Sequence, residues 1–174
     1  MIMAENDICK LRKLKMHDLD ILAKYANNKN IAINLRDGFP HPYSLDDAKK
    51  FYQLVKSMVP ESVFVIEHKD NFAGMIGLTP LKDVYCKTAE IGYWLAEPFW
   101  NKGIMTKAVL SMVNWGWENL DVVRIHTGIY AYNEASARVL EKSGFTFECE
   151  FINSIFKYGK LANERRYSIL KPLK

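Results

Sequence analysis

The stretch Pro98-Phe99-Trp100-Asn101-Lys102-Gly103-Ile104-Met105-Thr106 lies between a predicted strand, residues 89–95, and a predicted helix that begins near Met105. Apolar residues alternate with others in the first segment and recur at helical spacing in the second. A helix N-terminus offers unpaired backbone N–H groups and a partial positive charge, which favour a phosphate. Gly103 permits close backbone approach, and Lys102 adds a positive charge. The stretch therefore indicates an anion site, with an ordinary glycine-containing connection as the alternative.

The segments on both sides predict a mixed α/β (α+β) domain. Hydrophobic patterns predict strands over 8–14, 63–66, 72–79, 89–95, 122–130, 145–151 and 165–170 and helices over 18–27, 44–58, 105–117 and 134–143. Ser44 is expected to cap the second helix, and Gly144 to end the fourth in the left-handed conformation. Three consecutive strands in the middle argue against a doubly wound parallel sheet. We expect one open sheet of about seven strands with about four helices.

Composition limits the classes of function. The 174 residues carry a formal net charge of +4, which is mildly basic and well short of a nucleic-acid-binding surface. Three cysteines without a Cys-x-x-Cys pair fit a reducing compartment, and the four histidines show no metal-binding spacing. No apolar run approaches the roughly 20 residues of a membrane helix, and no secretory signal is visible. We expect one soluble, cytoplasmic domain, residues 8–172, without metal, nucleic acid or membrane.

A second informative segment is Asn133-Glu134-Ala135-Ser136, followed by Val139 to Phe145. Asn133 is placed to cap a helix, which is its ordinary interpretation. Its position at a strand end also suits an amide that binds a polar ligand between strands.

Three segments together resemble the GNAT superfamily of N-acetyltransferases, and more narrowly its RimJ/RimL branch. They are Glu90-Ile91-Gly92-Tyr93-Trp94-Leu95, the loop Trp100 to Thr106, and Asn133 through Phe145, in matching order and spacing. The resemblance covers residues 8–170 and is specific for the fold and for acetyl-CoA, but not for the acceptor. It implies an open, mostly antiparallel sheet with two splayed parallel strands at the cofactor cleft. Dimers are common among relatives, which makes a homodimer possible.

The resemblance also implies a function, direct transfer of an acetyl group from acetyl-CoA to a primary amine. The RimJ/RimL branch acetylates protein N-terminal amines, so a protein or peptide N-terminus is the expected acceptor. A small amine is the alternative, such as a polyamine, amino sugar, amino acid or antibiotic. A CoA-binding module without turnover is the third interpretation.

In this family the pyrophosphate is held by backbone N–H groups, here those of Lys102 to Thr106. Met105 replaces a small residue of the family pattern and is compatible only if its side chain points into the core. The pantetheine arm is expected between the splayed strands, with Asn133 near the thiol. The expected acetyl-CoA contacts are Trp94, Leu95, Ala96, Trp100, Asn101, Lys102, Gly103, Ile104, Met105, Thr106, Asn133 and Ser136.

Amine acetylation requires a neutral nucleophile and a stabilised leaving thiolate. Glu90 is the candidate base, with a carboxylate paired to a cation as its structural alternative. Many relatives carry an acidic Tyr seven residues after the Asn, but Leu140 stands there. Ser136, at the position of the RimJ/RimL serine, is the candidate acid, or else an ordinary residue of a helical first turn. Backbone N–H groups near Leu95 are candidates for stabilising the oxyanion.

Acceptor selection is expected in the loop from Asn34 to Tyr43. The candidate contacts are Arg36, Asp37, Phe39, His41, Tyr43 and, from the last strand, Tyr167. The loop's mixed charges do not suggest a polyamine site. Its proline-rich composition leaves the alternative that it only connects two helices.

Overall fold

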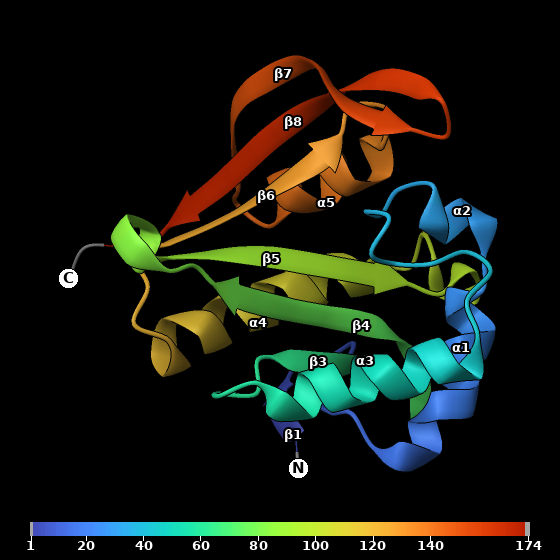
Figure 1. The fold of residues 1–174 in the computed structure, drawn as a ribbon. Coiled ribbons are helices and arrows are strands. Elements are labelled where there is room, and N and C mark those ends of the chain that lie inside the picture. Colours follow the sequence, from blue (N-terminus) through green and yellow to red (C-terminus); the bar gives the residue numbers. More distant parts are fainter. Residues whose placement is uncertain (1, 173–174) are drawn as a thin grey trace.

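The computed structural model describes residues 2–172, and its strands form one sheet in the order β1-β2-β3-β4-β5-β6-β8-β7 (Figure 1). Every neighbouring pair is antiparallel except β5 and β6, which are parallel. This confirms the mostly antiparallel sheet with one parallel pair. The strands are β1 (Ile2–Glu5), β2 (Lys10–Lys13), β3 (Val63–His68), β4 (Asn71–Pro80), β5 (Thr88–Leu95), β6 (Arg124–Tyr130), β7 (Thr146–Lys157) and β8 (Lys160–Leu170).

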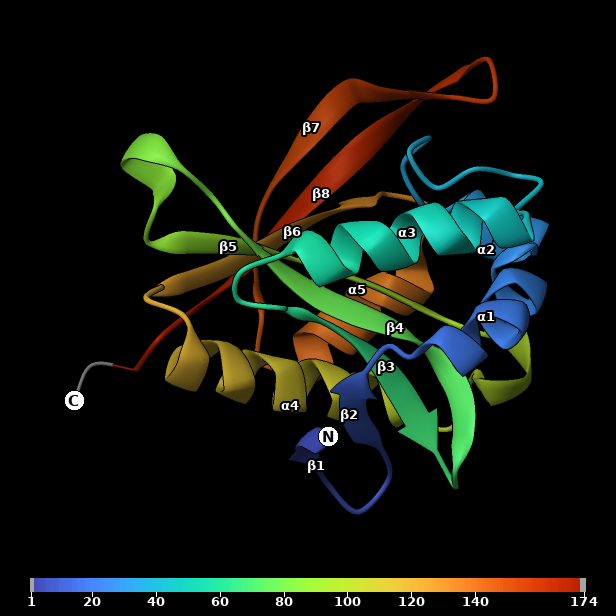
Figure 2. The ribbon, with the colours of Figure 1, turned by 60° about the horizontal axis from the view of Figure 1, so that its bottom comes forward.

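Helices cover both faces of the sheet. Figure 2 shows α3 on one face and α4 on the other. One core cluster joins α4 and α5 to the sheet, and a second joins α1 and α3 to the opposite face. The α-helices are α1 (Leu19–Ala26), α2 (Lys29–Ala32), α3 (Leu45–Ser57), α4 (Ile104–Asn119) and α5 (Glu134–Lys142), with single 3-10 turns at Met16–Asp18, Asp83–Tyr85 and Glu97–Phe99.

Local sequence explains the helix ends. Ser44 caps α3 as expected: its hydroxyl accepts from the Asp47 N–H, and the Asp47 carboxylate accepts from the Ser44 N–H. Gly144, at φ +84°, follows α5 in the left-handed conformation as expected. No helix of the described residues is long and apolar enough to cross a membrane.

The described chain has eight strands and five helices, slightly more than expected. The additional strand is β1, which pairs with β2 and begins before residue 8. The additional helix is α2, a single turn too short to produce a hydrophobic period. The last hairpin is also longer than expected, because β7 and β8 extend past the core as an exposed ribbon to Tyr158-Gly159. Without a buried face, that ribbon has no apolar alternation to reveal it.

The two parallel strands separate after a short paired segment. Their register pairs Thr88 with Arg124, Ala89 with Ile125 and Glu90 with His126, and stops there. Yet β5 continues alongside β4 to Leu95, and β6 continues alongside β8 to Tyr130. Figure 1 shows β5 and β6 diverging towards their carboxyl ends, with α2 and the segment after it at the open end. Beyond the Glu90–His126 pair, the facing edges of β5 and β6 are therefore not paired with each other. We call this gap between the two strands the split.

Candidate active site

The antiparallel registers identify which backbone groups face the split. In such pairs, alternate residues direct their N–H and C=O groups to the same neighbour. Ala96 N–H donates to the Ala73 carbonyl, in register with β4, so the even-numbered residues of β5 bond to β4. The odd-numbered Tyr93 and Leu95 consequently face β6.

The same argument applies to β6. Ala131 N–H donates to the Asn163 carbonyl, in register with β8, so the odd-numbered residues of β6 bond to β8. Gly128 and Tyr130 therefore face β5 across the split, beyond the last pair of the parallel register, although the Tyr130 carbonyl already accepts from Asn133 N–H. An extended chain with its own amides could bond to both strand edges, as an inserted strand would.

Two of the three predicted strand-end contacts, Trp94 and Ala96, do not direct free backbone groups to this edge. Trp94 directs its backbone groups to β4, and Ala96 is occupied on both sides, donating to Ala73 and accepting from Phe99 N–H. Leu95 alone of the three faces the split, and its carbonyl accepts from the Trp100 indole Nε1 at 2.7 Å. The alternation of backbone hydrogen bonds along β5 decides which residues face the split. The sequence alone does not show which of two neighbouring residues bonds to β4 and which faces β6.

The loop before α4 leaves its helix N-terminus open. Gly103 occupies the N-cap position at φ +72° and supplies no capping side chain, and a Cβ built on it meets nothing within 4 Å. The N–H groups of Ile104, Met105 and Thr106 belong to the first turn, which has no earlier helical carbonyl to bond. Met105 is only 8% exposed and packs in the core, so its side chain lies away from these N–H groups. The side chain of Met105 thus points into the core, as the sequence-based expectation required for binding of a phosphate at this loop.

We expect Gly103→Val to weaken acetyl-CoA binding at least about tenfold. A β-branched residue is strained at positive φ, and its side chain occupies the space through which a phosphate reaches the N–H groups. The matched control is Gly159→Val, also at positive φ with open space around it, in the β7–β8 turn. Calorimetric titration with acetyl-CoA compares the two variants, and equal loss of affinity in both would contradict this placement of the phosphate.

Ser136 and Tyr93 meet below the split. The Ser136 Oγ lies 2.7 Å from the Tyr93 hydroxyl, and the Ser136 side chain belongs to the first turn of α5. Asn133 caps that helix, its Oδ1 accepting from Ser136 N–H at 3.2 Å, which is its ordinary structural role. Burial raises the pKa of Tyr93, outweighing the opposite effect of the Ser136 hydrogen bond. Tyr93 is therefore a neutral phenol at physiological pH.

Glu90 lies on the opposite face of the sheet, at the last pair before the split. Its carboxylate accepts from Arg36, with Nη1 3.3 Å from Oε2 and a second, shorter contact from Nη2. This ion pair is the structural alternative expected for Glu90. Across the strand pair lies His126, whose pKa is lowered mainly by burial and further by the nearby cations Arg166 and Arg124, against the effect of Glu90.

Glu90 and the Tyr93–Ser136 pair therefore flank the split from opposite faces. Side chains of odd and even positions of one strand point to opposite faces. The even-numbered side chains of β5, among them Glu90 and Trp94, lie on one face, where Trp94 packs with the α1–α3 cluster. The odd-numbered Tyr93 lies on the other face, where it packs with the α4–α5 cluster. A group held in the split would meet a carboxylate from one face and two hydroxyls from the other.

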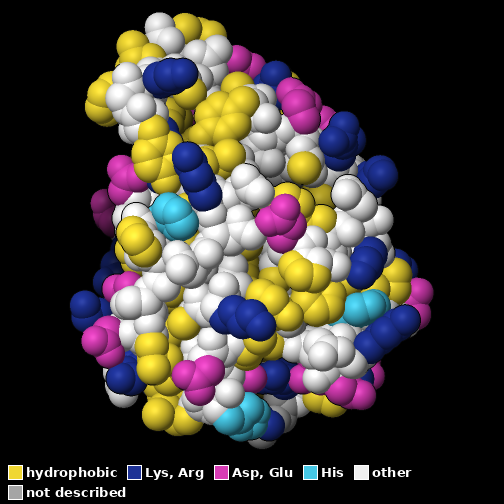
Figure 3. Space-filling model, turned by 90° about the vertical axis from the view of Figure 1, so that its right-hand side faces the viewer, with side chains coloured by type: hydrophobic (Ala, Val, Ile, Leu, Met, Phe, Trp, Pro, Cys, Tyr) yellow, Lys and Arg dark blue, Asp and Glu magenta, His cyan; other side chains and the backbone are white. Residues whose placement is uncertain are grey.

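The segment from Asn34 to Tyr43 is fixed across the open end of the split. Arg36 pairs with Glu90, Asp37 pairs with Lys157 at 2.6 Å, and Phe39 packs against Trp94 with ring centroids 6.0 Å apart. Tyr43 is buried, and burial raises its pKa to about 12; His41 is exposed. Figure 3 views the molecule from this end and shows acidic and basic side chains interspersed.

Tyr167 does not join the other acceptor candidates. It is 3% exposed on the α4–α5 face of the sheet, where its hydroxyl donates to Glu141 at 3.2 Å. This burial and the bond to Glu141 argue against the predicted contact of Tyr167 with the acceptor. Its position in the last strand indicated that Tyr167 lies near the site. The face of the sheet to which its side chain points depended on the β6–β8 register, which the sequence does not show.

Sequence reasoning missed Tyr93, His126 and Gly128 as residues of the site. Nothing local pairs Tyr93 with Ser136, 43 positions later. His126 becomes visible only through the parallel register with Glu90. A glycine within a predicted strand was the one available signal for Gly128, since it often marks a close approach. Among residues 2–172, no cluster of three or more His, Cys, Asp or Glu side chains could hold a metal.

A sheet split between two parallel strands, beside an open helix N-terminus and flanked by a carboxylate and a hydroxyl, is the arrangement that the resemblance implies for an acyl-CoA-dependent transferase. The acetyltransferase (GNAT) domain family matches residues 9–146, so the chain belongs to this family and is an acetyl-CoA-dependent acetyltransferase.

Individual relatives agree with this assignment. An uncharacterized N-acetyltransferase, YoaA of Bacillus subtilis, is 28% identical over 97% of this chain and 96% of its own. Spermidine N(1)-acetyltransferase of Escherichia coli is 25% identical over 93% of this chain and 86% of its own. The structure of RimL, a ribosomal L7/L12 alpha-N-protein acetyltransferase in complex with coenzyme A, has a TM-score of 0.87 at 21% identity and 98% coverage of both chains.

Proposed function

We propose that this protein transfers an acetyl group from acetyl-CoA directly to the N-terminal amine of a protein or peptide. The observation that carries the proposal is the split between β5 and β6, with Glu90 and Ser136 on its two faces. The free N–H groups at the start of α4 fit the pyrophosphate, and the backbone edges at Tyr93, Leu95, Gly128 and Tyr130 fit the amides of the pantetheine arm.

Each residue has a defined chemical task in this mechanism. Acetyl-CoA supplies the activated acyl group. Glu90 accepts, directly or through water, the proton that the attacking amine loses as the C–N bond forms. The Leu95 N–H faces the split and is placed to stabilise the oxyanion. As the C–S bond breaks and leaves its electron pair on sulfur, Ser136 directs its O–H to the sulfur, and water restores any proton it gives up.

The proposed acceptor follows from the charges around Glu90. A polyamine carries several cations and is best held by unpaired carboxylates. Here three carboxylates near the split have a basic partner: Glu90 has Arg36, Asp37 has Lys157, and Glu164 has Arg166 at 2.6 Å. Glu97, after the end of β5, accepts instead from the side-chain amides of Asn28 and Asn30. Such a neutralised surface suits a single amine followed by uncharged amides. An N-terminal α-amine, with a pKa near 8, also deprotonates more easily than a lysine.

Spermidine is the second candidate acceptor, because a relative that matches almost the whole chain is a spermidine acetyltransferase. If spermidine binds, the Arg36–Glu90 and Lys157–Asp37 pairs must open to release carboxylates for its ammonium groups.

The deciding experiment measures thiol release from acetyl-CoA with a panel of N-terminal peptides, polyamines, amino sugars and amino acids. We expect turnover with peptides, lost on N-terminal blocking, and strong reduction in Glu90→Gln. Turnover confined to a small amine would move the assignment to that class. Binding of acetyl-CoA without turnover of any acceptor would contradict the proposed acceptor class, and failure to bind it would contradict the donor.

A further inference from the structure

Tyr93 and Ser136 form a two-hydroxyl pair that the proposed mechanism uses only in part. The two side chains come from different elements, β5 and α5, and their oxygens lie 2.7 Å apart. Ser136 is 9% exposed, and its position is set by its own N–H, which donates to the Asn133 side chain. The contact is therefore built by tertiary structure and held from both sides.

A proton count shows that the pair has a free donor. Two hydroxyls carry two protons, and the hydrogen bond between them uses one. Among residues 2–172, neither oxygen has another hydrogen-bond partner. One O–H therefore remains available to an acceptor that is not part of the described chain. A buried donor of this kind is costly to leave unpaired, so a ligand atom is the natural partner.

The surroundings indicate which hydroxyl holds the free proton. Tyr93 is attached to the core by its ring, whereas Ser136 lies in the first turn of α5, where the helix dipole favours negative charge. Either oxygen could donate in this contact, and Tyr93, a protonated phenol at neutral pH, is able to be the donor. When Tyr93 donates to the Ser136 Oγ, the Ser136 proton is directed elsewhere. A ligand atom that becomes anionic during the reaction would be a suitable hydrogen-bond partner for this Ser136 O–H.

We propose that Tyr93 is a positioning residue that donates a hydrogen bond to the Ser136 Oγ and thereby directs the Ser136 O–H to the sulfur of coenzyme A. The proposal rests on the proposed function, in which Ser136 serves the leaving thiolate. Tyr93 itself touches no reacting atom.

The test uses Tyr93→Phe, which keeps the ring and removes only the hydroxyl. Calorimetry measures the affinity for CoA and for desulfo-CoA, which lacks the sulfur, at about pH 8.5, so that part of the thiol is ionised. We expect the affinity for CoA to fall about fivefold, the usual size of one hydrogen bond, and that for desulfo-CoA to stay within about twofold. In turnover, kcat falls about tenfold with KM for acetyl-CoA unchanged.

Controls separate this role from packing. Tyr85→Phe removes an exposed hydroxyl from the turn after β4 and should change neither affinity. In a Ser136→Ala background, Tyr93→Phe should have no further effect on CoA affinity, since the two residues act through one contact. Equal weakening of CoA and desulfo-CoA binding, or full additivity of the two substitutions, would overturn the proposal. Because binding is measured without an acceptor, this result is independent of whether peptides are acetylated.

Discussion

Replacement of Ser136 by alanine is expected to lower kcat about 100-fold, at the lower end of what a positioned acid contributes, while KM for acetyl-CoA changes by less than about twofold. The physical reason is that the Ser136 hydroxyl interacts with sulfur only as negative charge develops there. An interaction made in the transition state alone changes kcat and not binding. The family's alternative acid is missing, because the aliphatic Leu140 stands at its position, fully buried.

Steady-state kinetics with the best peptide of the panel, followed by thiol release, measures this effect. Ser57→Ala is the matched control, since its hydroxyl donates only to the Leu54 carbonyl at the end of α3. Thermal unfolding of both variants checks that the fold persists. A kcat within about threefold of the unsubstituted protein would show that Ser136 is only a residue of the first helical turn.

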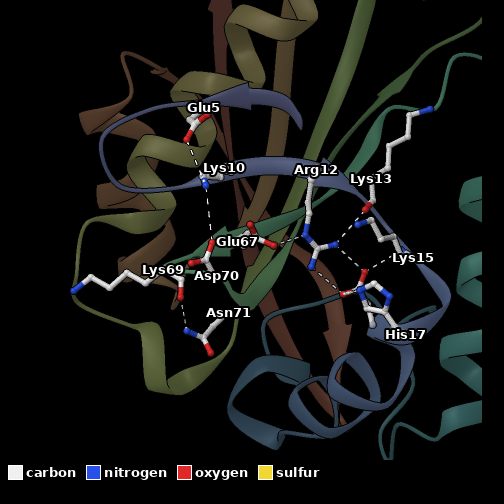
Figure 4. Close-up of polar contacts among 11 residues, drawn as sticks. Glu5, Lys10, Arg12, Lys13, Lys15, His17, Glu67, Lys69, Asp70 and Asn71 are labelled. Atoms are coloured by element: carbon white, nitrogen blue, oxygen red, sulfur yellow. Dashed lines mark hydrogen bonds and ion pairs between the residues drawn. The ribbon is translucent and has the colours of Figure 1, made fainter. Parts of the chain in front are cut away.

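Arg12→Met is expected to lower the free energy of unfolding by about 3–5 kcal/mol at neutral pH. Arg12 joins two carboxylates (Figure 4): Nη1 and Nη2 lie 2.8 and 2.9 Å from the two Asp18 oxygens, and Nε bonds to Glu67. The side chains of Arg12 and Asp18 are 11% and 4% exposed. Methionine retains most of the volume but leaves one deeply buried carboxylate without its cation.

The pH dependence of this effect has a definite sign. Burial alone would raise the pKa of Asp18, but hydrogen bonds from Arg12 and from the Lys15 backbone more than reverse this, so the pKa is lowered on folding. A carboxyl whose pKa is lowered on folding stabilises the protein above its unfolded pKa of about 4 and loses that contribution as pH falls through the folded pKa. In Arg12→Met this advantage is removed, so the difference between the two proteins is largest near pH 7 and shrinks below about pH 4.

Urea unfolding at several pH values measures both the size and the sign. The control is Lys49→Met, which removes an exposed cation from the Lys49–Asp46 pair on α3 and should cost less than about 1 kcal/mol. A loss for Arg12→Met no greater than for Lys49→Met, or one that grows on acidification, would contradict the assigned role of the cluster.

Local patterns were sufficient for most of the secondary structure. The Ser44 cap, the left-handed Gly144 and the apolar stripe of α4 depend on residues within a few positions of one another, and all three are confirmed. The short α2 and the exposed β7–β8 ribbon were missed or shortened, because neither buries a continuous face that would give a hydrophobic period.

The sequence by itself determined the family and the chemistry available: the open loop before α4, a carboxylate at Glu90, a hydroxyl at Ser136, and no tyrosine at Leu140. These are properties of residue type and spacing along one segment. Tertiary structure alone decided which backbone edges face the split, and that Tyr93 rather than Trp94 directs its backbone N–H and C=O groups there. It also decided that Tyr167 lies on the α4–α5 face of the sheet and that the hydroxyl of Tyr93 contacts that of Ser136. The physical reason is that strand register and the pairing of distant elements depend on contacts between segments, which no local pattern records.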